Sequence, residues 1–254
     1  MQFFYQLSGW QQALIACTFT WAMTAAGASL IFFFKNVGKS AFALMVSVAS
    51  GIMVASSFFS LLLPALESGG EYSYIVLTLG FIAGGAMIII ADIVVGKLRI
   101  VGDNTSRSCL VTCVAVTVHN IPEGMVVGVA FGAAAGNAAI LPAAMLALGI
   151  GIQNFPEGMC VALPLRANGC SRFRSFFIGQ LSGIVEIVSG VLGAAAVTFI
   201  SWILPFALAF SAGAMIAVVC SELVPKSCEA GKALSTLGVI GGFALMMILD
   251  IAFG

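Results

Sequence analysis

The sequence has 254 residues, of which 61% are hydrophobic and only 8% are charged, and its net charge is zero. Soluble globular domains usually contain about 25% charged residues, so this composition excludes a soluble globule and indicates an integral membrane protein. The neutral balance and the lack of a basic run also argue against nucleic acid as a partner. The lipid bilayer is therefore the expected environment.

Apolar runs separated by short polar breaks divide the chain into helices that are long enough to cross a bilayer. At about 20 residues for each crossing, the length allows roughly eight spans and no soluble domain, so residues 1–254 are expected to form a single transmembrane domain. The opening span lacks the basic n-region of a cleaved signal and is expected to be retained. The predicted helices cover residues 10–34, 40–63, 74–96, 108–133, 139–165, 175–200, 204–224 and 232–253.

The basic residues give the predicted orientation in the membrane. All ten Lys and Arg residues lie in the odd-numbered loops, which the positive-inside rule assigns to the cytoplasm. Both termini are then outside, which requires an even number of spans, and a plasma or inner membrane is the expected location. The residues concerned are Lys35, Lys39, Lys97, Arg99, Arg107, Arg166, Arg172, Arg174, Lys226 and Lys232.

A doubled polar motif lies in the predicted fourth and fifth helices, at residues 118–125 (VHNIPEGM) and 152–159 (IQNFPEGM). In each copy two polar residues share a helix face with a glutamate, because positions i, i+3 and i+4 are neighbours. Pro122 and Pro156 each leave the carbonyl four residues earlier without its helical hydrogen bond. A charge at a helix centre costs about 2.5–3.5 kcal/mol on insertion scales, so we expect a cation, protons or water to satisfy these groups. The side chains are His119, Asn120 and Glu123 in the first copy and Gln153, Asn154 and Glu157 in the second.

Six acidic residues lie in or near predicted helices. We expect none of them to have a basic residue nearby inside the membrane. Glu123, Glu157 and Glu186 are placed deepest, and buried carboxylates without Lys or Arg partners require protons or a metal. Imidazole with carboxylate suits a divalent first-row metal such as zinc, whereas amide oxygens are weaker donors that suit a passing ion. The six acids are Asp92, Glu123, Glu157, Glu186, Glu222 and Asp250.

A weaker internal similarity relates the predicted second and seventh helices. Residues 51–64 contain Gly-x-Met, then Ser-Leu, then proline, and residues 213–225 contain Gly-x-Met, then Glu-Leu, then proline. The two helices run in opposite directions, as do the helices that carry the doubled motif. This arrangement is typical of an inverted repeat with its site near the midplane, as in many secondary transporters.

The doubled motif resembles the paired signatures of the ZIP (Zrt/Irt-like protein) family of divalent metal transporters. The segment Ser57-Phe58-Phe59-Ser60-Leu61 followed by Pro64, and the segment Gly213-Ala214-Met215, also look like that family. The resemblance covers essentially the whole chain. It implies an all-α bundle of eight transmembrane helices in a 3+2+3 inverted repeat.

The resemblance also implies a binuclear metal site between helices four and five. The first position would use His119, Glu123, Gln153 and Glu157, with Met53 reaching in from helix two, and the second would use Asn120, Asn154 and Glu186, with Glu123 and Glu157 as bridges. Many members carry histidine in place of Gln153, and an acid is common in place of Asn154; both departures weaken the site. The implied function is import of zinc, or of cadmium, iron or manganese, into the cytosol by an elevator-like shift of one helix group against the other.

Two other functions are alternatives to metal transport. An intramembrane metal-dependent hydrolase could use the same ligands to activate water, but the sequence contains no His-Glu-x-x-His and no nucleophile paired with a base, so we expect no enzyme and no catalytic residues. A proton-coupled transporter of a small solute would need cationic anchors that helices four and five lack. The transported ion is a cargo, and no cofactor is expected. The sequence leaves monomer and homodimer open.

Overall fold

The computed structural model describes residues 2–33, 38–68, 70, 73–99, 104–134, 140–167, 169–199, 204–229 and 231–253. Over these residues all regular secondary structure is helical, as the sequence predicted. Several helices continue one another and form longer rods. The elements are α1 (Gln2–Tyr5), α2 (Gly9–Phe33), α3 (Lys39–Ser56), η1 (Ser57–Leu62), α4 (Leu63–Ser68), α5 (Ser73–Arg99), α6 (Asn104–Ala134), α7 (Ile140–Ala167), α8 (Arg172–Phe199), α9 (Leu204–Val218), η3 (Val219–Leu223), α10 (Val224–Cys228) and α11 (Lys232–Phe253).

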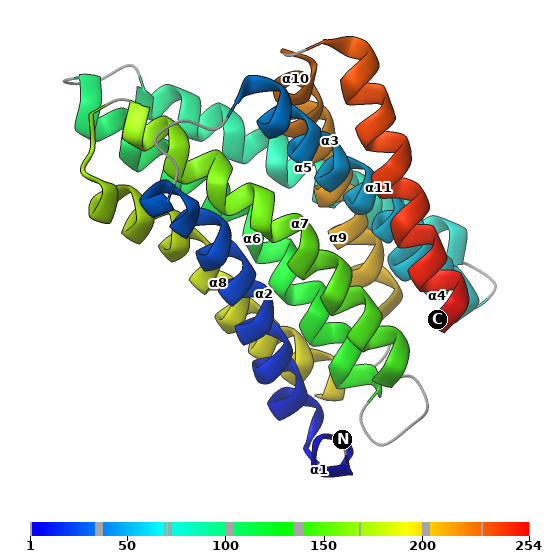
Figure 1. Cartoon of the computed structure of the whole chain (residues 1–254). Coiled ribbons are helices and arrows are strands. Elements are labelled where there is room, and N and C mark those ends of the chain that lie inside the picture. The colour runs from blue at the N-terminus through cyan, green and yellow to red at the C-terminus, as the bar shows by residue number, and fades with distance from the viewer. Residues whose placement is uncertain are drawn as a thin grey trace.

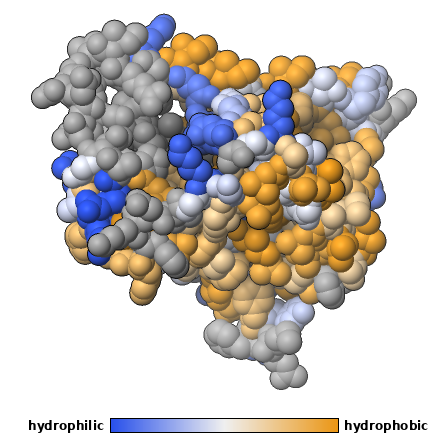
Figure 2. Space-filling model, turned by 45° about the horizontal axis from the view of Figure 1, so that its top comes forward, coloured by the Kyte–Doolittle hydropathy of each residue, from blue (hydrophilic) through white to orange (hydrophobic). Residues whose placement is uncertain are grey.

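Seven helical stretches of the described chain are long and apolar enough to cross a membrane, which confirms the predicted class of an all-helical integral membrane protein. A further long helix, α6, has 31 residues, and the side chains of residues 104–116 within it lie outside the described part. The outer faces suit lipid: α5 exposes Leu79, Ile82 and Ile90 by 58–61%. Figure 2 shows apolar side chains over much of the displayed surface, with hydrophilic side chains gathered in patches.

The helices pack as two groups, which lie side by side in Figure 1. In the first group α6 packs along α8, and α2 packs along both α7 and α8. In the second group α3 packs along α11, and α5 packs along α9. Contacts of α3 with α7 and of α6 with α9 join the groups, so the two motif helices α6 and α7 lie where the groups meet.

The α3–α11 and α9–α5 pairs are packed in the same way. In each pair, each helix contributes one glycine that lies against the backbone of the other helix. On every helix this glycine is three residues away from the residue that the partner's glycine contacts. A Cβ atom on any of these glycines would lie 1.8–2.1 Å from a carbonyl oxygen, closer than real Cβ atoms come. The contacts are Gly51 with Val239, Gly242 with Val48, Gly213 with Phe81 and Gly84 with Phe210.

The helices that carry the weak internal similarity also share a π-helical segment. One lies at Ser57–Leu62 before Pro64, and the other at Val219–Leu223 before Pro225. The N–H groups of Leu63 and Val224 bond to carbonyls five residues back. Proline lacks an N–H and disrupts the regular ladder, and one wider turn just before it accommodates the disruption.

Candidate metal centre

The structure brings most of the predicted site residues into the buried interior where α6, α7 and α8 meet. The five polar residues of the doubled motif whose side chains are described are 0–7% exposed, and Glu186 on α8 is 0% exposed. Because the side chains at i, i+3 and i+4 of a helix share a face, the two copies present their polar groups inward together. The five residues are Asn120, Glu123, Gln153, Asn154 and Glu157.

Direct backbone contacts fix the position of both motif helices. A Cβ atom on Gly124 would lie 2.3 Å from the carbonyl oxygen of Glu186 on α8, and one on Gly158 would lie 2.0 Å from that of Thr24 on α2. Only glycine allows helices to approach this closely. The glycine that follows each motif glutamate therefore seats α6 on α8 and α7 on α2, which sets the depth of Glu123 and Glu157.

Glu123 and Gln153 form one half of the polar cluster. The Gln153 Nε2 group donates to Glu123 Oε1 at 2.7 Å. The other oxygen of each side chain, Glu123 Oε2 and Gln153 Oε1, is buried and has no hydrogen-bond partner within the described residues. Glu123 also experiences the charges of Glu157 and Glu186. A buried acceptor without a donor costs free energy, so these two oxygens could accept a cation or a donor from outside the described side chains.

Glu186 forms the other half, and its carboxylate is well supplied with donors. Asn120 Nδ2 donates to Oε1 at 3.1 Å, and Asn154 Nδ2 lies 2.9 Å from Oε1 and 2.8 Å from Oε2. Thr20 Oγ1 on α2 donates to Oε2 at 2.5 Å. The structure thus joins three predicted residues, Asn120, Asn154 and Glu186, and adds a fourth.

Thr20 is a site residue that sequence reasoning missed. It is 0% exposed and belongs to α2, a helix to which the sequence assigned no part in the site. A single threonine in an apolar helix usually bonds to its own backbone, so its residue type carried no signal. Only the packing of α2 against α8 reveals its contact with Glu186.

The remaining predicted ligands are His119 and Met53. The His119 side chain lies outside the described residues, although its backbone belongs to α6. Met53 is 1% exposed on α3 and belongs to the same buried apolar cluster as Val126 and Val127 of α6. No three His, Cys, Asp or Glu side chains of the described chain gather closely enough to hold a metal. A complete ligand shell around Glu123 and Glu157 therefore needs amide oxygens, His119 or both.

One prediction about the acidic residues was wrong. Glu222 was expected to have no basic residue nearby, yet its Oε2 accepts a hydrogen bond from Lys226 Nζ at 2.5 Å, as part of an ion pair. The reason is that the helix continues through Pro225 to Cys228, so residues 222 and 226 lie one turn apart on the same face. Their side chains are 33% and 41% exposed, so the pair lies at the edge of the bundle.

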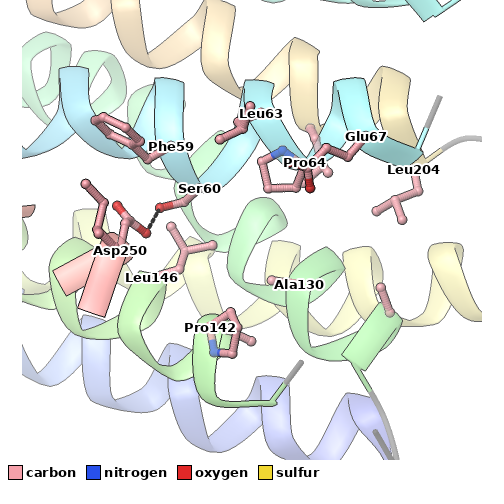
Figure 3. A pocket seen from close by; sticks show the side chains of 14 residues that line it. Phe59, Ser60, Leu63, Pro64, Glu67, Ala130, Pro142, Leu146, Leu204 and Asp250 are labelled. Atoms are coloured by element: carbon pink, nitrogen blue, oxygen red, sulfur yellow. Dashed lines mark hydrogen bonds between the residues drawn. The ribbon is translucent and has the colours of Figure 1, made fainter. Parts of the chain in front are cut away.

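A cavity of about 550 Å³ lies between the two helix groups. Its walls come from η1 and α4, from the C-terminal end of α6, from the first turns of α7 and α9, and from the end of α11. Figure 3 shows Asp250 and Ser60 joined at one side of it, where Ser60 Oγ donates to Asp250 Oδ1 at 2.7 Å, and Glu67 farther along the same wall as Ser60. Asp250 Oδ2 is buried and has no partner within the described residues. The cavity is mostly apolar but contains two acids.

Comparisons with known proteins agree with these features. A family model described as "ZIP Zinc transporter" matches residues 104–250, a range that contains both motif copies. Zinc transporter ZIP11 of Homo sapiens is 34% identical over 96% of this chain and 97% of its own length. Zinc transporter GufA of Myxococcus xanthus is 33% identical over 95% and 98%, and zinc transporter ZIPB of Bordetella bronchiseptica is 34% identical over 92% and 78%. The match confirms the resemblance read from the doubled motif, and the chain belongs to the ZIP zinc transporter family.

Proposed function

We propose that this protein imports a divalent metal ion, zinc in the first place, across the membrane into the cytosol. The observation that carries the proposal is a pair of buried oxygens without hydrogen-bond donors, one on Glu123 and one on Gln153, near a second buried glutamate, Glu157. Glu123 Oε2 and Gln153 Oε1 have no partner within the described residues, and Glu157 is 7% exposed close by in the same motif. Two buried carboxylates, one of which has an oxygen without a partner within the described residues, form a site that a doubly charged ion would neutralise.

In this proposal Glu123 and Glu157 supply the two negative charges of the ion's ligand shell. Gln153 now donates its amide N–H to Glu123 at 2.7 Å, and a turn of the amide would present its free oxygen instead. His119 and Met53 complete the shell. A shell diluted by an amide and a thioether favours an ion that must be released again, since transport requires loading and unloading. Cadmium, iron and manganese are the alternative cargoes.

The two helix groups suggest how the ion would move. The group of α2, α6, α7 and α8 carries every proposed ligand except Met53, which lies on α3 in the other group. A shift of the first group against the second would carry the ion across the membrane in an elevator-like motion. The matched glycine contacts and π-helical segments of α3 and α9 support the inverted repeat that such a motion uses.

The proposed orientation has eight spans, both termini outside and the odd-numbered loops in the cytoplasm of a plasma or inner membrane. On this orientation the cavity of about 550 Å³ opens on the outer side, because its wall contains the end of α11 and the beginnings of α7 and α9. Asp250 and Glu67 would then attract cations at the entrance. The three relatives are named zinc transporters, in agreement with the prediction that the chain is a transporter and not an enzyme.

Uptake of radioactive zinc into proteoliposomes tests the proposal. Glu123→Gln and Glu157→Gln should each reduce uptake to near the level of empty vesicles, because each removes one of the two charges that balance the ion. Glu229→Gln is the matched control, since Glu229 is an exposed acid after α10, and it should transport like the wild type. If the variants at 123 and 157 accumulate zinc at the wild-type rate, the proposed site is wrong.

A further inference from the structure

Glu186 differs from Glu123 in how its carboxylate oxygens are satisfied, while the Oδ1 atoms of Asn120 and Asn154 are buried without a hydrogen-bond partner within the described residues. Both of its oxygens accept hydrogen bonds, from Thr20, Asn120 and Asn154. Glu123 has a single donor on one oxygen and none on the other within the described residues. A buried carboxylate that has several short hydrogen bonds is stabilised without a metal, whereas one that lacks donors is not.

The three donors come from three different helices. Thr20 lies on α2, Asn120 on α6 and Asn154 on α7, while Glu186 itself lies on α8. These are all four helices of the first group. A single carboxylate therefore connects every helix of that group at one depth, and all four side chains are 0% exposed.

Close backbone contacts lie beside these hydrogen bonds and also hold the helices together. The glycine after Glu123 packs on the carbonyl of Glu186 itself, with a Cβ position 2.3 Å from it. On the other side Gly27 of α2 packs on the carbonyl of Phe155, the residue after Asn154, with a Cβ position 1.8 Å from it. Close packing and hydrogen bonds together leave these helices little freedom to move relative to one another.

We infer that Glu186 is the hub of a metal-independent lock, formed with Thr20, Asn120 and Asn154, that holds α2, α6, α7 and α8 as one body. The lock occupies the position at which the family resemblance implied a second ion. The amide N–H groups supply there the hydrogen bonds that stabilise the Glu186 carboxylate in place of a second metal. The protein then binds one ion, beside Glu123 and Glu157. Asn154 determines this number, because its amide N–H donates a hydrogen bond to Glu186 at the position where an acidic side chain would bind a second metal ion.

Unfolding of the purified, chelator-treated full chain tests the lock without any metal. Thr20→Val keeps the shape and removes the donor, so its unfolding midpoint should fall by about 3–12 °C relative to the control Thr18→Val. Thr18 is an exposed threonine of the same helix that bonds only to Leu14 of its own helix, at 2.7 Å. Thr20→Ser retains the hydroxyl and should unfold close to the wild type. A Thr20→Val midpoint equal to that of Thr18→Val would overturn the inference.

Zinc titration calorimetry gives the second readout, which is the number of zinc ions bound per chain. The wild type should bind one zinc per chain, and Asn154→Asp should bind two. In the variant a carboxylate that can bind metal replaces the amide that donates a hydrogen bond to Glu186. Two zincs in the wild type with one lost in Glu186→Gln would overturn the inference, as would an Asn154→Asp variant that stays at one. The zinc count rests on the proposed function, but the metal-free unfolding does not. A wild type that binds no zinc would therefore refute the transport site, while the lock would still be decided by the Thr20 variants.

Discussion

Gly158→Ala is the substitution for which the structure allows the most direct calculation. The added Cβ would lie 2.0 Å from the carbonyl oxygen of Thr24 and 2.9 Å from both Thr24 C and Ala28 N. Cβ atoms essentially never approach closer than 3.0 Å, so α7 and α2 must separate by at least 1 Å. All three neighbours belong to the backbone of α2, so no flexible side chain can move aside to reduce the strain.

The expected destabilisation combines two opposite effects. Overpacking against a rigid backbone costs about 3 kcal/mol, at the upper end of the usual range. The higher helix propensity of alanine returns about 1 kcal/mol. The net loss of about 2 kcal/mol should lower the unfolding midpoint by about 4–8 °C in a chain of this size. Zinc binding should weaken as well, because Glu157 precedes the glycine and moves with α7.

Thermal unfolding in detergent and zinc titration calorimetry measure both effects. The matched control is Gly241→Ala, because Gly241 is an exposed glycine of α11 with nothing within 4 Å of its Cβ position. This variant should unfold at or slightly above the wild-type temperature and bind zinc normally. If Gly158→Ala is as stable as Gly241→Ala and binds zinc as tightly, the contact between α2 and α7 does not position Glu157 and the reasoning fails.

Three further predictions concern the ion and its path. Zinc binding should weaken as the pH falls from neutral to about 5.5, because carboxylates and imidazole must lose their protons to bind metal; an affinity that stays constant over this range in calorimetry would contradict carboxylate ligation. Gln153→His should tighten zinc binding about tenfold, since imidazole is a better zinc ligand than an amide; an unchanged affinity would mean that residue 153 does not contact the ion. Asp250→Asn should slow zinc uptake into proteoliposomes while leaving equilibrium binding unchanged, because Asp250 lines the cavity that the proposed orientation places on the outer side, away from Glu123 and Glu157; normal uptake would exclude the cavity as the entrance.

The fold class and the centre of the site could be predicted from the sequence because both depend on local patterns. Long apolar runs indicated membrane helices, and helical periodicity placed Glu123 and Glu157 on the same helix faces as the other polar residues of the doubled motif. The structure buries both residues, as expected, in α6 and α7. The family was also readable from these residues, because the paired motif is specific.

The hydrogen-bond partners could not be predicted, because they depend on which helices pack together. Glu186 comes 29 residues after Glu157, and only the packing of α8 against α6 and α2 brings it to Asn120 and Thr20. The ion pair of Glu222 with Lys226 was missed for a local reason. The predicted helix ended at residue 224, whereas the π-helical turn before Pro225 lets the helix continue to Cys228.

The central claim is that one ion binds directly between Glu123 and Glu157. A crystal structure of the zinc-loaded protein, with anomalous data collected at the zinc edge, measures this most directly. We predict one anomalous peak at about 2.0–2.2 Å from carboxylate oxygens of both glutamates, with Gln153 Oε1 turned toward it. A peak located away from both carboxylates, or a pair of equal peaks with the second held by Glu186, would contradict the account.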